Sequence, residues 1–365
     1  MTTLSIGNRA RRFCSSCIVG IAVSQVLAAT ICDASEIAFD QGRLASINAR
    51  MNESVAAHKI AGAVTAVATK SQIVHLSTVG QADIESGRAM QADSIFRIAS
   101  MTKPITATAL MILHDEGRLL IDDPIEKFIP AFKGQKLKDG TAARAVTIRD
   151  VLTHTAGLSR PPGEEFLTKS VEKIVNEIGK APLAFEPGSK WQYSSGLTVA
   201  ARIIEVLSEQ SYEDFLDSRL FKPVGMTDTT FVLSNAQAAR LATTYSPQKG
   251  GGGVVPSDHA FVVLDPTVRR TPNPSGGLFS TAADIARFYQ MILSGGQVSG
   301  RSIISKKSID LMISIHSGDV VTGFTPGNGW GLGWCVVRNP QGVSRLLNPG
   351  TCGHGGAFGT QVWMD

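Results

Sequence analysis

The sequence predicts an α/β chain in which strands near both ends form one domain and a mainly helical segment is inserted between them. Three observations predict this arrangement. Short β-prone runs lie before residue 80 and after residue 330, helical patterns between Pro- and Gly-rich loops fill 119–272, and 365 residues are enough for about two domains. We therefore expect a discontinuous α/β domain formed by 35–118 and 273–365, with an inserted helical domain at 119–272.

The first 34 residues have the pattern of a secretory signal peptide. Arg9, Arg11 and Arg12 precede an apolar stretch at 17–29, and no acidic residue occurs before Asp33. A positive segment followed by a short apolar segment is typical of such signals, and this apolar run is short for a membrane span. We expect residues 1–34 to be removed, and the mature protein to be periplasmic or secreted without stable membrane insertion. An uncleaved amphipathic anchor is the alternative.

Local patterns predict the elements in order. Apolar residues at helical spacing predict a helix over 39–59, and two β-prone runs predict a hairpin over 61–79. A further helix ends near Glu116, where Gly117 provides the stop. Beyond it we expect helices at 171–178, 197–208, 212–220 and 281–293, a glycine loop at 250–253, and strands at 331–337 and 359–364.

Charge and cysteine content exclude several classes of function. With 35 basic and 31 acidic residues the formal net charge is only +4, which gives no basic surface for nucleic acid. The His and Cys residues have no metal-ligand spacing, so we expect no metal or other cofactor. Cys335 and Cys352 lie in strand-like stretches, where buried thiols or a disulfide are both compatible with the sequence.

The segment 98–104 carries the pattern most indicative of chemistry. If Ser100 opens a helix, Lys103 lies one turn further on the same face, so that its amine reaches the hydroxyl. Pro104 fits this placement, because proline is tolerated in the first turn of a helix. A serine hydroxyl needs a base to become a nucleophile, and free N–H groups at a helix start suit a developing oxyanion.

Five further motifs occur in a fixed order with this one, and together they resemble the serine hydrolase family of class C β-lactamases, D,D-peptidases and family VIII carboxylesterases. The matches are S-x-x-K at 100–103, H-T-[SA]-G-L at 154–158, Y-x-[NS] at 193–195, P-[LV]-G-M at 223–226, S-G-G-L-x-S-T at 275–281, and H-x-G in place of K-[TS]-G at 354–356. The resemblance covers the chain from about residue 94 to 365. It implies the β-lactamase/penicillin-binding-like fold, with an antiparallel sheet flanked by helices.

The resemblance also implies roles for individual residues. Ser100 would attack an acyl carbonyl, Lys103 would take its proton, and Tyr193 would act as second base and as acid to the leaving group. The N–H groups of Ser100 and Ala357 would form the oxyanion hole. His154 belongs to a motif that looks like a structural loop. Ser195, His354, Gly355 and Gly356 would line the substrate side, with His354 steadying the Tyr193 oxygen, binding a substrate carboxylate, or serving the structure only.

Two departures from the β-lactamase pattern favour an esterase. Ser195 stands where those enzymes have an asparagine whose amide bonds both substrate and lysine. His354 replaces the lysine that anchors the β-lactam carboxylate, and histidine is largely neutral at pH 7. We therefore expect a carboxylesterase for small uncharged acyl esters. A D,D-peptidase or β-lactamase acting on amides or β-lactams is the alternative, and a non-catalytic penicillin-binding relative is a third reading.

The end of the sequence departs from the family as well. The family has more sheet and a C-terminal helix after the strand that begins near Gly359, whereas this sequence stops at Asp365. We therefore expect a chain that lacks the C-terminal strand and helix, with reduced stability. The sequence carries no indication of the oligomeric state.

Overall fold

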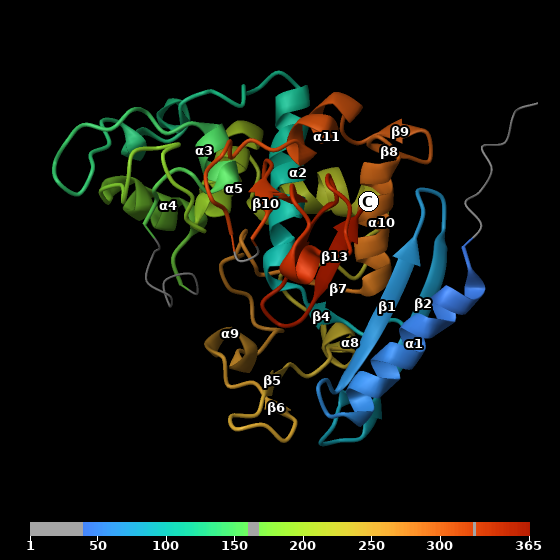
Figure 1. Cartoon of the computed structure of the whole chain (residues 1–365). Coiled ribbons are helices and arrows are strands. Elements are labelled where there is room, and N and C mark those ends of the chain that lie inside the picture. Colours follow the sequence, from blue (N-terminus) through green and yellow to red (C-terminus); the bar gives the residue numbers. More distant parts are fainter. Residues whose placement is uncertain (1–38, 160–167, 324–325) are drawn as a thin grey trace, which may run out of the picture. The chain divides into compact units, whose positions relative to one another are not determined.

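The computed structural model describes residues 39–159, 168–323 and 326–365. Residues 40–365 form one compact unit, whose arrangement is shown in Figure 1. The predicted signal peptide at 1–34 lies outside the described residues. The division into an α/β domain and an inserted helical domain remains a prediction.

The N-terminal elements of this unit follow the sequence patterns closely. Helix α1 spans Gln41–Ala56 and begins where the Asp40 carboxylate accepts the N–H groups of Gly42 and Arg43. Strand β1 (Gly62–Ala68) pairs antiparallel with β2 (Ile73–Asp83), and the short β3 (Arg88–Ala89) extends this sheet. The predicted helix and hairpin are thus confirmed.

A second antiparallel sheet is formed near the C-terminal end, in the order β10-β11-β12-β13. Its strands are β10 (Asn328–Trp330), β11 (Cys335–Val337), β12 (Cys352–Gly355) and β13 (Gln361–Met364). The prediction of one strand over 331–337 is wrong in its first half, because the chain turns there between β10 and β11. Gly333 adopts a φ of 79° in that turn, which L-residues with side chains rarely adopt. The predicted strand near 359–364 is confirmed as β13.

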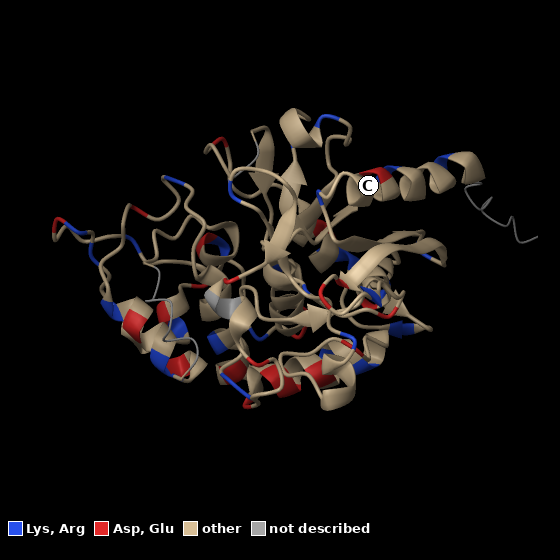
Figure 2. Ribbon diagram, turned by 90° about the horizontal axis from the view of Figure 1, so that it is seen from below, with Lys and Arg blue, Asp and Glu red and all other residues tan. Residues whose placement is uncertain are grey.

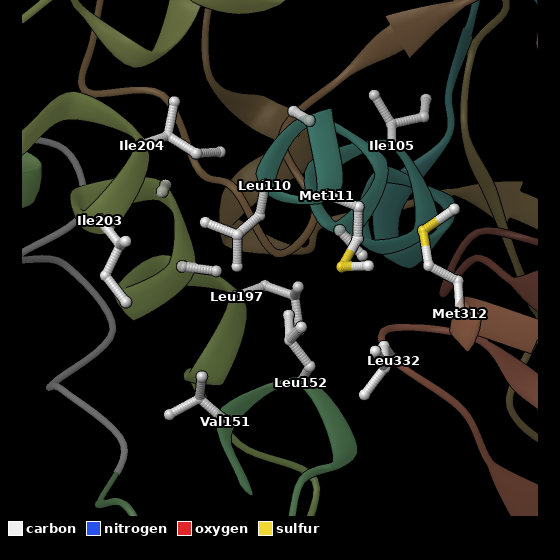
Figure 3. Close-up of a cluster of buried hydrophobic side chains, with 14 of the residues drawn as sticks. Ile105, Leu110, Met111, Val151, Leu152, Leu197, Ile203, Ile204, Met312 and Leu332 are labelled. Carbon is white, nitrogen blue, oxygen red and sulfur yellow. The ribbon is translucent and has the colours of Figure 1, made fainter. Parts of the chain in front are cut away.

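Helix α2 spans Thr102–Asp115 and is buried along nearly its whole length. It contacts α5 (Gly196–Ser208), which in turn contacts α3 (Ile148–Thr153) and α4 (Val171–Lys180). Figure 3 shows Leu110 and Met111 of α2 pointing toward Leu197 of α5. One hydrophobic core therefore continues from the helical part of the chain to the elements that carry Ser100.

Further strands and helices complete the unit. They comprise β4 (Phe96–Arg97) paired with β7 (Phe279–Ser280), the hairpin β5 (Tyr245–Pro247) and β6 (Val254–Pro256), β8 (Gln297–Val298) with β9 (Arg301–Ser302), and the helices α6 (Tyr212–Leu216), α7 (Lys222–Val224), α8 (Asn235–Ala238), α9 (Ala260–Val263), α10 (Ala282–Leu293) and α11 (Lys306–Ile313). The helix expected at 212–220 is α6 followed by a π-turn at Asp217–Phe221. The glycine run 250–253 lies between β5 and β6, where a loop was expected.

Helices combined with antiparallel sheets give the α/β class that the sequence predicted. Within the described ranges, no helix combines the length and the apolar character that crossing a bilayer requires. Figure 2 shows acidic and basic residues mixed along the helices in that view. Cys335 and Cys352 lie on the neighbouring strands β11 and β12 as free, buried thiols.

Candidate active site

Ser100 lies in a 3₁₀ turn, Ala99–Met101, that runs directly into α2. The residue before it, Ala99, has a φ of 46°, a left-handed conformation that is strained for alanine. The Thr102 hydroxyl fixes this turn, because it donates to the Ala99 carbonyl (2.7 Å) and accepts the N–H of Leu278 (3.3 Å). Ser100 is therefore presented at the start of a buried helix, as the sequence predicted.

Lys103 follows one turn later and is 2% exposed. Its Nζ donates to the Ser100 Oγ at 3.1 Å and to the Ser275 carbonyl at 2.5 Å. The same Nζ lies 4.4 Å from the centre of the Tyr193 ring. The buried amine thus lies between the serine, the tyrosine and the S-G-G-L segment.

Tyr193 belongs to a cluster of rings that joins four segments of the chain. Its members are His154, Trp191, Tyr193, Trp330 and His354. The shortest separation is between His154 and Tyr193, with ring centroids 4.5 Å apart. The sequence pointed to Tyr193 and His354, but it did not indicate that Trp191 and Trp330 contact Tyr193 or that Trp330 also contacts His354, because neither tryptophan belongs to a motif.

His354 lies on β12, is 5% exposed and does not line the pocket described below. Its Nδ1 bonds the Gly355 carbonyl at 2.6 Å, so Nδ1 carries the proton and Nε2 is an acceptor. Burial, reinforced by the nearby Lys103 amine, lowers the pKa of His354 to about 3. This histidine is therefore neutral at pH 7, and it adds an acceptor beside the lysine in place of a cation.

The chain turns sharply after β12, and this turn brings Ala357 to the site. Gly356 donates its N–H to the Thr360 carbonyl at 2.6 Å, and the Thr360 hydroxyl donates to the Ile98 carbonyl at 3.3 Å. A Cβ at Gly356 would lie 2.5 Å from that Ile98 oxygen, so only glycine fits. Ala357 itself lies in the turn between β12 and β13.

A cavity of about 500 Å³ opens over Ser100, and its size is typical of a small-molecule site. Ser100, Lys103, Tyr193, Ser195 and Ala357 line it. Most other lining side chains are apolar, among them Phe231, Leu264, Val268, Phe279 and Phe358. Ser195 precedes α5, and no hydrogen bond of its hydroxyl is recorded in the described part of the chain, which leaves that hydroxyl available to a substrate.

The structure thus brings Ser100, Lys103, Tyr193, Ser195 and Ala357 to one cavity, while His354, Gly355 and Gly356 support it from outside the lining. The Ser275 carbonyl is an additional partner of Lys103 that sequence reasoning missed. The S-G-G-L motif marked its position, but backbone contacts leave no signal in residue types. Among the described residues, no group of three or more His, Cys, Asp or Glu is arranged to hold a metal ion.

Comparison with known proteins places this site in a family. The Beta-lactamase family model matches residues 47–365, and the chain therefore belongs to this family of serine hydrolases and is an enzyme of that class. It is 30% identical to Esterase EstB of Burkholderia gladioli, over 91% of this chain and 90% of the esterase. It is 31% identical to Penicillin-binding protein 4 of Amycolatopsis lactamdurans, over 83% and 76% of the two chains.

A solved structure agrees with this assignment at the level of the fold. The hydrolase EstCE1, described as having promiscuous acyltransferase activity, superposes with a TM-score of 0.75. The superposition covers 89% of this chain and 91% of that chain, with 23% sequence identity. The β-lactamase/penicillin-binding-like fold expected from the motifs is therefore confirmed.

Proposed function

We propose that this enzyme is a carboxylesterase that hydrolyses small acyl esters through a covalent acyl-Ser100 intermediate. The observation that carries the proposal is the 3.1 Å hydrogen bond between the buried Lys103 Nζ and the Ser100 Oγ at the floor of a largely apolar cavity. The similarity to a protein named as an esterase supports the same reaction.

The reaction begins when the Ser100 Oγ attacks the ester carbonyl. Lys103 accepts the hydroxyl proton, and the negative charge that develops on the carbonyl oxygen is stabilised by the N–H groups of Ser100 and Ala357. The tetrahedral intermediate then expels the alcohol, which receives a proton from Tyr193. A water molecule then attacks the acyl-serine and gives a proton to the deprotonated Tyr193. The acid is released, and the Ser100 Oγ recovers its proton from Lys103.

The state of His354 supports an ester in which the part next to the reacting carbonyl is uncharged. The family's lysine would supply a fixed cation at this position, whereas His354 is buried and neutral at pH 7. An uncharged ester needs no such cation, because its binding comes from burial of apolar surface in the cavity. We therefore expect β-lactam cleavage to be weak or absent.

A D,D-peptidase or β-lactamase activity is the second candidate, and the relative named as a penicillin-binding protein supports it. We also propose, from the pattern at 1–34, that the enzyme is exported to the periplasm or the medium. N-terminal sequencing of the secreted product tests the export, since the signal must then be absent.

Turnover of p-nitrophenyl butyrate and nitrocefin by the wild type and Ser100→Ala tests the function. We expect hydrolysis of the ester to exceed that of nitrocefin and to be lost in Ser100→Ala. The exposed Ser46, whose hydroxyl bonds the Arg43 carbonyl within α1, offers a matched control in Ser46→Ala. A reversed ranking of the substrates would assign the enzyme to the β-lactam group, and equal activity of Ser100→Ala would refute the nucleophile.

A further inference from the structure

Two arginines line the cavity above Ser100, although the chemistry proposed so far uses neither. They are Arg97, three residues before Ser100 on β4, and Arg270, in the segment between α9 and β7. A guanidinium group keeps its charge at any pH relevant to the enzyme. Two cations in a mostly apolar cavity therefore need an explanation.

Arg97 is partly buried and lacks a carboxylate partner among the described residues. Its Nη2 donates to the Val262 carbonyl at 3.0 Å, and its guanidinium carbon lies 5.4 Å from the centre of the Phe279 ring. The buried Nε has no hydrogen-bond partner in this part of the chain. Burial lowers the pKa of Arg97, because its charge is partly removed from water and no anion compensates it.

Arg270 is held in a similar way, by backbone oxygens. Its Nη1 donates to the carbonyls of Asp265 (2.6 Å) and Val268 (3.2 Å). The neighbouring Arg269 differs, because it points away from the lining and pairs with the Glu213 carboxylate at 2.8 Å. Backbone carbonyls orient a guanidinium group without neutralising it, so Arg270 keeps its positive charge for another anion.

Most other partly buried arginines in the described chain have carboxylate partners. The pairs are Arg149 with Asp122, Arg202 with Glu172, Arg219 with Glu116, Arg240 with Asp228 and Arg338 with Asp319. Arg88, which donates to the Leu241 carbonyl, also lacks an ion pair but lies outside the cavity lining, whereas Arg97 and Arg270 both line the cavity. An unpaired cation in such a site is costly, and a substrate anion would compensate it.

The lining contains one carboxylate, that of Asp265, whose pKa is lowered by hydrogen bonds from Thr267 and by the nearby charge of Arg270. Asp265 accepts hydrogen bonds from the N–H (2.9 Å) and the hydroxyl (2.6 Å) of Thr267, and it forms no ion pair with either arginine within the described residues. Two guanidinium groups therefore face one carboxylate. The lining keeps an excess of positive charge.

We propose that Arg97 and Arg270 form a carboxylate-binding subsite, so that the preferred ester carries a carboxylate in addition to the acyl group that Ser100 attacks. This inference rests on the proposed esterase function and refines its substrate class. The neutral His354 concerns the reacting carbonyl, whereas the two arginines bind a separate, anionic part of the same molecule. That part belongs either to the acyl chain or to the alcohol.

Matched esters that differ only in charge test the subsite. The p-nitrophenyl monoester of adipic acid carries a carboxylate where the p-nitrophenyl ester of adipamic acid carries a neutral carboxamide of the same shape. The esters 3-carboxyphenyl butyrate and 3-carbamoylphenyl butyrate place the same pair of groups on the alcohol. In at least one pair we expect kcat/KM to be about tenfold higher for the anion, as for one charge-assisted hydrogen bond.

Substitution of the arginines must remove this preference selectively. Arg97→Met keeps an apolar stem over Phe279. In this variant and in Arg270→Met we expect the ratio of kcat/KM for the anionic ester to kcat/KM for the neutral ester to fall close to one. Only the kcat/KM of the anionic ester should decrease. Arg269→Met is the matched control and should keep the wild-type ratio. The preference of the wild type should also decrease with added salt. Ratios near one for both pairs in an active wild type would overturn the subsite and leave the esterase intact.

Binding without turnover separates the two proposals. Calorimetry with Ser100→Ala should show tighter binding of the monoanilide of adipic acid than of its carboxamide analogue, and the difference should vanish in the double variant with Arg97→Met. If this difference appears while no ester is turned over by the wild type, the subsite stands and the esterase proposal fails. Equal binding of both ligands would contradict the subsite.

Discussion

The imidazole of His154 lies against the ring of Tyr193, with centroids 4.5 Å apart and planes inclined by 36°. His154 is fully buried and adopts a φ of 62° where α3 ends. Its Nδ1 accepts the N–H of Ser194 at 3.2 Å, and its carbonyl accepts the N–H of Gln192 at 2.9 Å. One histidine thus holds the residues on both sides of Tyr193 and contacts the tyrosine itself.

This contact predicts that His154 positions Tyr193 and takes no part in proton transfer. We expect His154→Ala to lower kcat by roughly 10- to 100-fold with little change in KM, because a small displacement of Tyr193 suffices for such a loss. His154→Asn keeps an acceptor for Ser194 and tolerates a positive φ, so it should recover part of kcat. Stopped-flow turnover with thermal melts checks both variants. Recovery of the fold in His154→Asn without any recovery of kcat would contradict the positioning role.

We expect substitution of Lys103 to abolish turnover while leaving the melting temperature almost unchanged. Lys103→Met removes a buried amine and fills the space with an apolar side chain, so turnover of p-nitrophenyl butyrate should fall by about 10³-fold or more. The melting temperature should stay within a few degrees of the wild type, because the lost bonds to Ser100 and Ser275 are offset by relief of desolvation. Calorimetric melts and ester assays on the same samples provide the comparison. Retained turnover would exclude the amine as the base.

The low pKa of His354 predicts acid sensitivity of the fold. In the unfolded chain this residue titrates near 6.5, whereas the folded protein binds its proton only near pH 3. Between these values the unfolded state binds more protons, so stability falls as the pH is lowered. At pH 4 the loss due to His354 is of order 3 kcal/mol. Urea unfolding at pH 7, 5 and 4 should show a smaller decline for His354→Gln than for the wild type, and parallel declines would argue against a depressed pKa.

Gly355, the last residue of β12, and Gly356, which follows it, provide a matched pair. A Cβ at Gly356 would lie 2.2 Å from the Thr360 hydroxyl and 2.5 Å from the Ile98 carbonyl, whereas the nearest atom to a Cβ at Gly355 is 4.0 Å away. We expect Gly356→Ala to lower stability by about 1–3 kcal/mol and kcat by about 10²-fold. Gly355→Ala should behave like the wild type in both respects. Equal stability and equal kcat of the two alanine variants would contradict the close approach of Gly356 to Thr360 and Ile98.

Cys335 and Cys352 should be unreactive in the folded enzyme. Burial raises the pKa of both thiols to about 12, so the thiolate is scarce at neutral pH. In a preparation that begins at residue 35, iodoacetamide at pH 8 should label neither thiol until urea unfolds the chain, when mass spectrometry should find two labels. Labelling of the native protein, or no labelling after unfolding without reductant, would indicate an exposed thiol or a disulfide.

The sequence predicted most helices and the residues around Ser100 because both depend on local patterns. Lys103 is one helical turn from Ser100, and α1, α4 and α10 have capping side chains at the start of an apolar face. The turn at Gly333 and the turn that carries Ala357 could not be predicted, because they depend on how distant segments pack. The role of Arg97 was equally hidden, since its missing partner is a property of the folded cavity.

The hydrogen bond from the Thr360 hydroxyl to the Ile98 carbonyl joins residues 262 positions apart, and the bond from Lys103 to Ser275 joins residues 172 apart. Contacts so distant in sequence form late in folding, after the loops between them have closed. A chain emerging from the ribosome therefore carries Ser100 for most of its synthesis without these contacts to Ile98 and Lys103. Hydrolysis of a fluorogenic ester should begin only after β12 has left the ribosome, so we expect the enzyme to be inactive during its synthesis.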